Sequence, residues 1–309
     1  MAAEQADKAR MSLRDEWREV WALGGLRVST LARRVWDEIN ADDVWGYAAQ
    51  LAYYFLFSLF PFFIFLAALL AYIPIPDLME QIMALLGQLL PGTVLDMVKD
   101  NVLELVTQPR GGLLSFGILL ALWTAASGIA AMTDSLNRAY GVKEGRAFWK
   151  VRLVAVSLTI GLAALMLASM ALLIFGSELG SLVAAKVGLG AAFDTAWEFA
   201  RWPIIVFLMM FGAALIYYFA PDVEQEWRWI TPGSVFAVLA WILMSLVFTW
   251  YVDNFGNYSV TYGSIGAVIV LLTWMYFTGF FLLVGGEINA EIEHAATSGK
   301  APGKKRLPK

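Results

Sequence analysis

Six long apolar runs, separated by polar segments, set the pattern of the chain. A helix rises about 1.5 Å per residue, so it needs about 20 apolar residues to cross a bilayer core about 30 Å thick. The runs have about this length, and the pattern therefore predicts an all-α integral membrane protein, a six-transmembrane-helix bundle. The predicted spans cover residues 48–73, 112–133, 153–176, 203–220, 233–252 and 265–284.

Amphipathic segments flank the membrane domain, which we place at residues 46–294. Residues 1–45 carry apolar side chains at steps of three and four with arginines between them, which predicts an amphipathic N-terminal segment in the cytoplasm. This pattern fits a helix on an anionic membrane surface as well as a helix packed on its own protein. Prolines divide residues 74–111 into two predicted surface helices, and residues 295–309 form a predicted disordered basic tail.

Composition supports the membrane class and excludes others. Apolar residues make up 60% of the chain and charged residues 16%, against about 25% charged in an average soluble domain. The chain has no cysteine, and its single histidine, His294, lies in the polar tail, so thiol chemistry and histidine-based metal sites are excluded. There is no HExxH, Walker or Gly-x-Ser-x-Gly motif. We expect no cofactor, no metal and no enzymatic activity.

The basic residues are distributed unevenly between the two sides of the predicted bundle. Eighteen lie before the first span, in the loops between spans two and three and between spans four and five, or in the tail. Four lie in the remaining loops, on the opposite side. Because cytoplasmic loops are enriched in Lys and Arg, this asymmetry places both termini in the cytoplasm.

Polar side chains around the last two spans are candidates for a substrate path. The loop that begins at Asp253 has many hydrogen-bonding groups and one charge, which favours a loop folded back into the bundle. Glu287 follows an apolar helix beside Gly285; it is a functional candidate if the helix continues and merely interfacial if the helix ends there. Pro61 predicts a kink in the first span. The path candidates are Asp253, Asn254, Asn257, Tyr258, Tyr262, Glu287, Asn289, Pro61 and Ser58.

A loop rich in basic and aromatic residues follows the second span. Its basic residues are typical of a cytoplasmic loop, and its aromatic residues are typical of the membrane–water interface, which together explain its composition. Binding of lipid headgroups is the alternative. The headgroup candidates are Arg138, Lys143, Arg146, Lys150 and Arg152.

Several motifs follow one another in order along the chain: Ala52–Tyr54, Ser58–Pro61, Phe219–Pro221, Pro232-Gly233, Tyr262–Gly266, Trp274 and Leu283–Ala290. This ordered set resembles the YihY/BrkB family of bacterial inner-membrane proteins over about residues 30–295. The resemblance implies a six-span protein of poorly defined activity, once labelled ribonuclease BN and connected with serum resistance and with envelope lipid or lipopolysaccharide transport.

Pattern and resemblance together lead us to expect a multi-pass protein of the bacterial cell inner membrane, a transporter or flippase-like protein for a small or lipidic envelope substrate. The alternative is a non-transporting scaffold or envelope-integrity factor that binds lipid or a partner protein. We expect membrane lipids as partners, no nucleic acid because the chain is acidic with a net charge of −4, and possible homo-oligomers. The ribonuclease label is unsupported, because a nuclease needs metal ligands or acid–base pairs near a cationic groove.

We predict that a single cysteine introduced at Thr107 or Asn257 is labelled from outside intact cells, because both positions lie on the side poor in basic residues. The chain has no cysteine of its own, so each label reports one site. A membrane-impermeant thiol reagent makes the measurement. Labelling at a cysteine in place of Ser298, together with none at Asn257, would overturn the topology.

Overall fold

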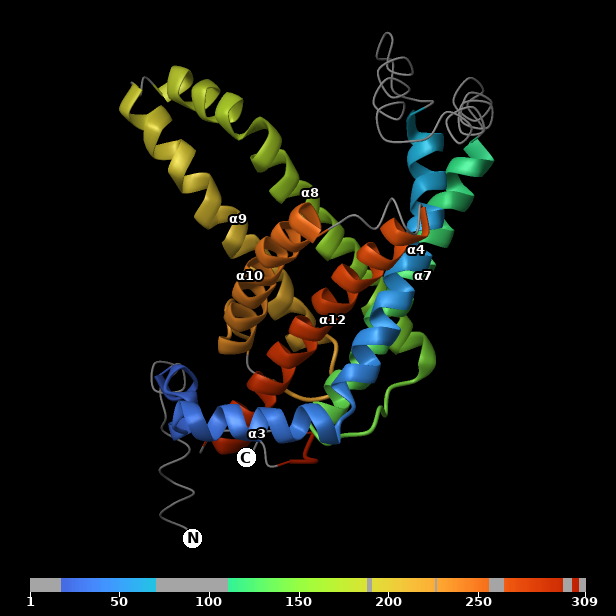
Figure 1. Cartoon of the computed structure of the whole chain (residues 1–309), viewed down its shortest axis with the longest axis vertical. Coiled ribbons are helices and arrows are strands. Elements are labelled where there is room, and N and C mark those ends of the chain that lie inside the picture. Colours follow the sequence, from blue (N-terminus) through green and yellow to red (C-terminus); the bar gives the residue numbers. More distant parts are fainter. Residues whose placement is uncertain are drawn as a thin grey trace. The chain divides into compact units, whose positions relative to one another are not determined.

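The computed structural model describes residues 18–70, 111–187, 191–225, 227–255, 264–296 and 302–305 (Figure 1). These parts are helical and contain no strand. A 3-10 turn, η1, covers Leu23–Gly25. It is followed by the helices α3 (Val28–Ala41), α4 (Val44–Leu70), α7 (Gly111–Ala139), α8 (Phe148–Val187), α9 (Ala191–Phe219), α10 (Pro232–Phe255) and α12 (Ser264–Ala295).

The predicted all-α class is confirmed, and the predicted spans fall on α4, α7, α8, α9, α10 and α12. Five stretches among the described residues are long and apolar enough to cross a membrane, by length and composition: Ser115–Ala139, Phe148–Leu173, Ala196–Phe219, Pro232–Val252 and Val268–Ala295. The helices extend beyond most of the predicted boundaries, because the polar residues at their ends continue the helix. The predicted surface helices at 74–111 and most of the tail lie outside the described residues.

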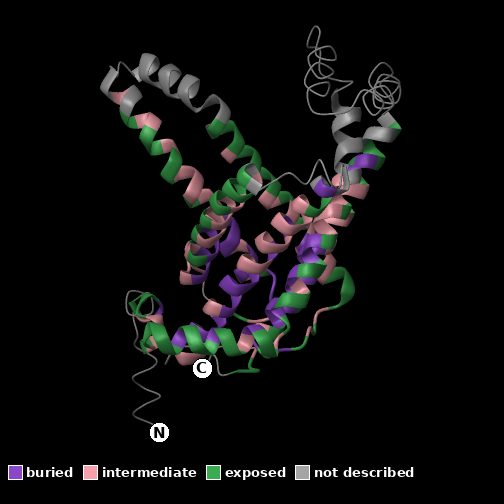
Figure 2. Cartoon of the chain, in the orientation of Figure 1, coloured by how far each residue is buried: buried purple, intermediate pink, exposed green. Residues whose placement is uncertain are grey.

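The chain forms two compact units, one made of Met1–Tyr53 with Ala126–Lys309 and the other of Tyr54–Ala125. In the larger unit, α12 packs along α10 and against α3 and η1, and α9 packs against α8 and α10. Figure 2 shows buried positions gathered where α12 meets α10 and α3. The residues that fill this core include Met132, Leu136, Leu283 and Ile292, each almost fully buried.

The amphipathic helix α3 uses its apolar side to pack against its own protein. Leu31, Val35 and Ile39 are buried there, and α12 is the helix that α3 contacts. Trp36 on the other side remains 57% exposed. The corner into α4 is made by Asp43, whose φ of 55° is left-handed and whose Oδ1 accepts a hydrogen bond from the Gly46 amide at 3.2 Å.

A contact between backbones joins α10 to α12. A Cβ atom on Gly285 would lie 2.6 Å from the carbonyl oxygen of Gly233, and a Cβ on Gly233 would collide with the carbonyl oxygen of Gly285. The Tyr217 hydroxyl of α9 donates a hydrogen bond of 2.6 Å to the carbonyl oxygen of Leu282 just before this crossing. Glycine is therefore required at this crossing, because close packing of helices in lipid depends on small residues.

We predict that Gly233→Ala lowers the stability of the purified protein by about 1–3 kcal/mol, because the added methyl group overpacks the crossing of α10 and α12. Gly161→Ala in α8 is the matched control, since a Cβ there meets no atom within 4 Å. The control is expected to change stability by less than about 1 kcal/mol, toward greater stability. Thermal unfolding in detergent makes the comparison, and equal effects of the two substitutions would contradict it.

Candidate functional site

Glu287 is a buried acid inside α12. The helix passes through Gly285 and Gly286 and continues to Ala295, so it does not end before the acid. The Glu287 side chain is 1% exposed, and its Oε2 atom has no hydrogen-bond partner among the described residues. Acids at such positions in membrane helices are rare, and they mark functional sites by default.

The glycine pair explains why Glu287 is so closely enclosed. Gly285 faces the Tyr217 hydroxyl of α9, and Gly286 faces the Leu136 side chain of α7. Without a Cβ at either glycine, these two side chains approach the α12 backbone one turn or less before the acid. The packing that shields Glu287 is therefore encoded in the Gly285-Gly286-Glu287 sequence itself.

The charged groups that act on Glu287 are three further carboxyls, those of Asp42, Glu38 and Glu291. Burial raises the pKa of Asp42, an effect that Arg138 partly offsets. Burial also raises the pKa of Glu38, and the carboxyls of Asp42 and Glu291 add to the increase. Among the described residues, the charged groups that act on Glu287 are therefore all acidic.

Glu291 pairs with Arg34 and lies beside His294. Arg34 of α3 lies 3.6 Å from its Oε2, and His294 Nδ1 lies 3.7 Å from its Oε1. His294 belongs to α12 and its side chain is 8% exposed, which corrects its placement in a polar tail. Its ring also meets that of Tyr140 edge-on, with centroids 5.9 Å apart.

Asn289 lies two residues after Glu287, but its side-chain amide hydrogen-bonds to the start of α10. Its Oδ1 accepts a hydrogen bond from the Gly233 amide at 2.9 Å, and its Nδ2 donates to Thr231 Oγ1 at 3.0 Å. Thr231 and Ser234 cap the start of α10 reciprocally, each side-chain oxygen accepting from the other's backbone amide. Asn289 thereby fixes the position of α10 on α12.

Of the other path candidates, Asn254 lies far from Glu287 along α10. Asn254 belongs to α10, is exposed, and donates a hydrogen bond of 2.8 Å to the carbonyl oxygen of Trp250. Because the Gly233 end of α10 meets α12 near Glu287, Asn254 lies about 30 Å along the helix from that contact. The side chain of Asp253 and the residues Asn257, Tyr258 and Tyr262 are outside the described residues.

Ser58 and Pro61 lie in the part of α4 that belongs to the smaller unit. Ser58 Oγ donates a hydrogen bond of 2.7 Å to the carbonyl oxygen of Phe55. Pro61 is buried, and α4 continues through it to Leu70.

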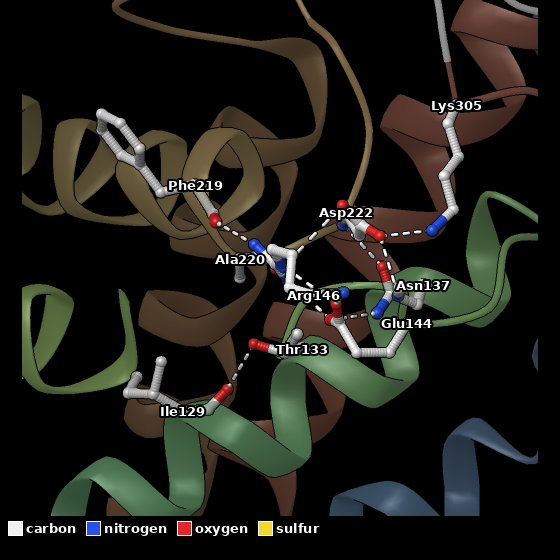
Figure 3. A network of polar contacts seen from close by, with 10 residues as sticks. Ile129, Thr133, Asn137, Glu144, Arg146, Phe219, Ala220, Asp222 and Lys305 are labelled. Carbon is white, nitrogen blue, oxygen red and sulfur yellow. Dashed lines mark hydrogen bonds and ion pairs between the residues drawn. The ribbon is translucent and has the colours of Figure 1, made fainter. Parts of the chain in front are cut away.

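A second polar centre, the loop network, consists of Asn137, Glu144, Arg146, Asp222 and Lys305 (Figure 3). Arg146 donates through Nε and Nη2 to the two carboxylate oxygens of Glu144, at 2.9 and 2.7 Å. Its Nη2 also donates to the carbonyl oxygen of Ala220 at 2.6 Å. Asn137 links the same carboxylate to the next loop, because its Oδ1 accepts from the Asp222 amide at 2.7 Å.

The end of the described chain joins this network. Lys305 Nζ pairs with the Asp222 carboxylate, and the Lys305 carbonyl oxygen accepts from the Glu224 amide at 2.7 Å. Burial raises the pKa of Glu144, but the hydrogen bonds from Arg146 and Asn137 outweigh it and hold the pKa at about 2. The network therefore fastens the α7–α8 loop, the α9–α10 loop and the C-terminal segment through an ionised carboxylate.

The basic residues predicted to bind headgroups occupy different environments. Arg146 is engaged in the loop network, Arg152 donates to Ser127 Oγ at 3.0 Å, and the Arg138 guanidinium lies 5.3 Å from the centre of the Tyr47 ring. Lys143 and Lys150 are exposed. The exposed rings of Phe148 and Trp149 lie next to Lys150 in sequence.

The apolar helices define a membrane protein, and the buried acid in α12 is its most unusual feature. The chain belongs to the virulence factor BrkB family, which it matches over residues 35–308. The resemblance seen in the sequence motifs is thereby confirmed.

The relatives carry two kinds of name. YfkH of Bacillus subtilis (strain 168), named a ribonuclease-like protein, is 42% identical over 245 residues, or 79% of this chain and 88% of YfkH. UPF0761 membrane proteins of Chromohalobacter salexigens and Verminephrobacter eiseniae are 30% and 27% identical, each over 84% of this chain. The chain spans 62% and 61% of the length of these two proteins. No solved structure matches the chain.

We predict that Arg146→Ala lowers stability by about 1–3 kcal/mol, because it removes the side-chain donor of the Ala220 carbonyl and the two guanidinium hydrogen bonds of the Glu144 carboxylate. Lys143→Ala, an exposed change in the same loop, is the control and is expected to be nearly neutral. Glu144 has a folded-state pKa of about 2, below the ordinary 4.5. Its contribution is therefore full above pH 4.5 and declines as the pH falls toward 2.

Unfolding of both variants and the parent protein, measured by intrinsic fluorescence across this pH range, tests the prediction. The difference between Arg146→Ala and the parent should shrink on acidification. A difference that is absent at neutral pH, or that grows in acid, would contradict the role assigned to the loop network.

Proposed function

We propose that this protein moves a small or lipidic envelope substrate across the bacterial inner membrane, as a transporter or flippase-like protein, and that Glu287 is the functional group at one end of the path. The observation that carries the proposal is the buried Glu287 side chain, with one carboxyl oxygen that has no partner among the described residues.

A structural role does not explain this acid. Leaving a buried polar atom without a hydrogen bond costs about 1–3 kcal/mol, and an apolar side chain of similar size would pack here without that cost. Asn289, two residues further on, illustrates the structural alternative, because both ends of its amide are hydrogen-bonded. Glu287, in contrast, has a carboxyl oxygen that is not engaged in a hydrogen bond among the described residues. Such an atom is expected in a group that binds a proton, an ion or a substrate in one state of a transport cycle.

The surroundings of the acid fit a path that begins at the cytoplasmic side. The basic asymmetry of the sequence puts the α3 end of α12 in the cytoplasm. In this orientation Glu287 lies at the depth of the inner leaflet. Asn254, at the other end of α10, lies toward the outer side of the membrane. Exposed Lys143, Lys150, Phe148 and Trp149 are suited to the headgroup region of the inner leaflet, where basic and aromatic side chains bind anionic lipid.

The energy source follows from what the sequence lacks. It contains no phosphate-binding loop for a nucleotide, so active movement of a substrate depends on an ion gradient. In the absence of coupling, the protein would carry its substrate passively.

We predict that Glu287→Gln abolishes complementation of a bacterial strain deleted for this protein, while its amount in the membrane and its unfolding temperature stay near those of the parent. Glutamine keeps the size and polarity of the side chain and removes the exchangeable charge. Asp37→Asn, at an exposed site on α3, is the control and should complement fully. Asn254→Ala tests the other end of the path and is expected to fail as well.

Two outcomes would redirect the proposal. If Glu287→Gln and Asn254→Ala both complement, the path lies elsewhere. If both fail to accumulate, the residues are structural, and a scaffold that binds lipid or a partner protein is the better interpretation.

We further propose that the protein is not a ribonuclease, although its relative YfkH carries a ribonuclease-like name. Among the described residues no group of three or more His, Asp or Glu side chains is placed to hold a metal ion. We predict no turnover of a tRNA precursor by stringently purified protein. Turnover that survives purification and disappears with a point substitution in this chain would refute the prediction.

A further inference from the structure

The polar residues of the second half of α12 are arranged in a row. Glu287, Glu291 and His294 are spaced i, i+4 and i+7, which places them on one face of the helix. That face meets α3, since Arg34 of α3 pairs with Glu291 at 3.6 Å. The row starts at the buried acid and ends one residue before the end of α12.

The three side chains are buried, and the first and the last each have a polar atom without a hydrogen-bond partner among the described residues. Glu287 is 1% exposed and Glu291 9%, and the His294 side chain is 8% exposed. Glu287 Oε2 and His294 Nε2 are both buried and have no hydrogen-bond partner in the described part of the chain. Buried polar atoms are almost always satisfied, so two such atoms on one helix face require an explanation.

We propose that Glu287 is a proton-binding site supplied through Glu291 and His294, a relay that makes H⁺ the coupling ion if the proposed transport function is correct. A proton suits the site better than a metal ion. Calcium takes six or more oxygen ligands, and no group of three metal-ligating side chains is placed together among the described residues. A single proton neutralises Glu287 without further ligands.

The groups around Glu287 support this choice. Glu38 and Asp42, on and just after α3, and Glu291 on α12 are acids, and each disfavours a second negative charge beside it. Tyr217 of α9 gives its hydroxyl hydrogen to the carbonyl oxygen of Leu282. At the start of α10 the nearby side chains, Thr231 and Ser234, are uncharged, and the amide of Asn289 on α12 is hydrogen-bonded to that end of α10. None of these groups supplies a positive charge to Glu287.

Each step transfers one proton between two lone pairs. Protonated His294 passes the proton on Nδ1 to Glu291 Oε1, which lies 3.7 Å away, through a water molecule or after a small approach of the two side chains, and becomes neutral imidazole protonated on Nε2. The Glu291 carboxylic acid then passes it one helical turn along, directly or through a water molecule, to the Glu287 carboxylate and returns to its charged form. Arg34 stabilises that charged form, so Glu291 transmits the proton and does not retain it. His294 Nε2, the atom without a partner among the described residues, takes up the incoming proton that makes the ring a cation and keeps it when Nδ1 gives its own away. The neutral ring then returns to its starting tautomer by releasing the Nε2 proton and taking one up on Nδ1 from water, which frees Nε2 for the next proton.

The experiment is a pH jump on the parent protein in lipid nanodiscs, followed by infrared difference spectroscopy of the carboxylic acid carbonyl band. We expect a protonated carboxyl signal that is absent in Glu287→Gln and unchanged in Asp37→Asn. If Glu287→Gln does not accumulate, Glu287→Asp replaces it and should shift the band without abolishing it. His294→Gln is expected to keep the band and slow its hydrogen–deuterium exchange by about a hundredfold or more.

A band that persists in Glu287→Gln, or an exchange rate that His294→Gln leaves unchanged, would overturn the relay. The relay and the proposed function can fail separately. Loss of complementation by Glu287→Gln with no titrating carboxyl would overturn the relay and leave the transport function standing. A titrating band together with full complementation would support the relay and refute the function.

Discussion

The contact between Gly233 and Gly285 is the interaction on which the rest of this site depends. Because neither residue has a side chain, the backbones of α10 and α12 touch, and Asn289 fixes the start of α10 against the same stretch of α12. The next two positions are Gly286, which admits Leu136 of α7, and the acid itself. A single short sequence, Gly285-Gly286-Glu287, thus brings the helices together and encloses a carboxyl group at the crossing.

The loop network lies close to the same end of α12. Tyr140 and Val142, next to Asn137, bury against Ala290 of α12, and Tyr140 also meets the ring of His294. The network ties together two loops that are distant in sequence, through Glu144, Arg146 and Asp222, and Lys305 adds the C-terminal segment as the third. The hydrogen bonds of the loop network hold the loops beside the end of the polar row, whereas Glu287 Oε2 and His294 Nε2 in that row have no partner among the described residues.

The fold class and the location of the helices could be predicted from the sequence, because apolar runs of membrane length have one plausible structure. Glu287 could also be singled out, since an acid after a long apolar run is visible as an exception. Pairings between distant residues could not be predicted. Nothing in the sequence around Arg146 distinguishes an arginine bonded to Glu144 and Ala220 from one facing lipid headgroups, and residues 137 and 222 become neighbours only in the folded chain. The sequence predicts a tail position for His294, because charged residues after Gly286 are typical of a helix end, whereas in the structure α12 continues to Ala295 and packs against α3.

The central claim is that a path through the protein reaches Glu287. A structure determined in a lipid bilayer, at a resolution that shows water molecules and lipid, tests it most directly. We predict a water-filled or lipid-filled cavity that opens toward the α3 side of α12 and places a water molecule or a polar headgroup within hydrogen-bond distance of Glu287 Oε2. A carboxyl group enclosed by packed side chains, with no such cavity in the presence or absence of a pH gradient, would contradict it.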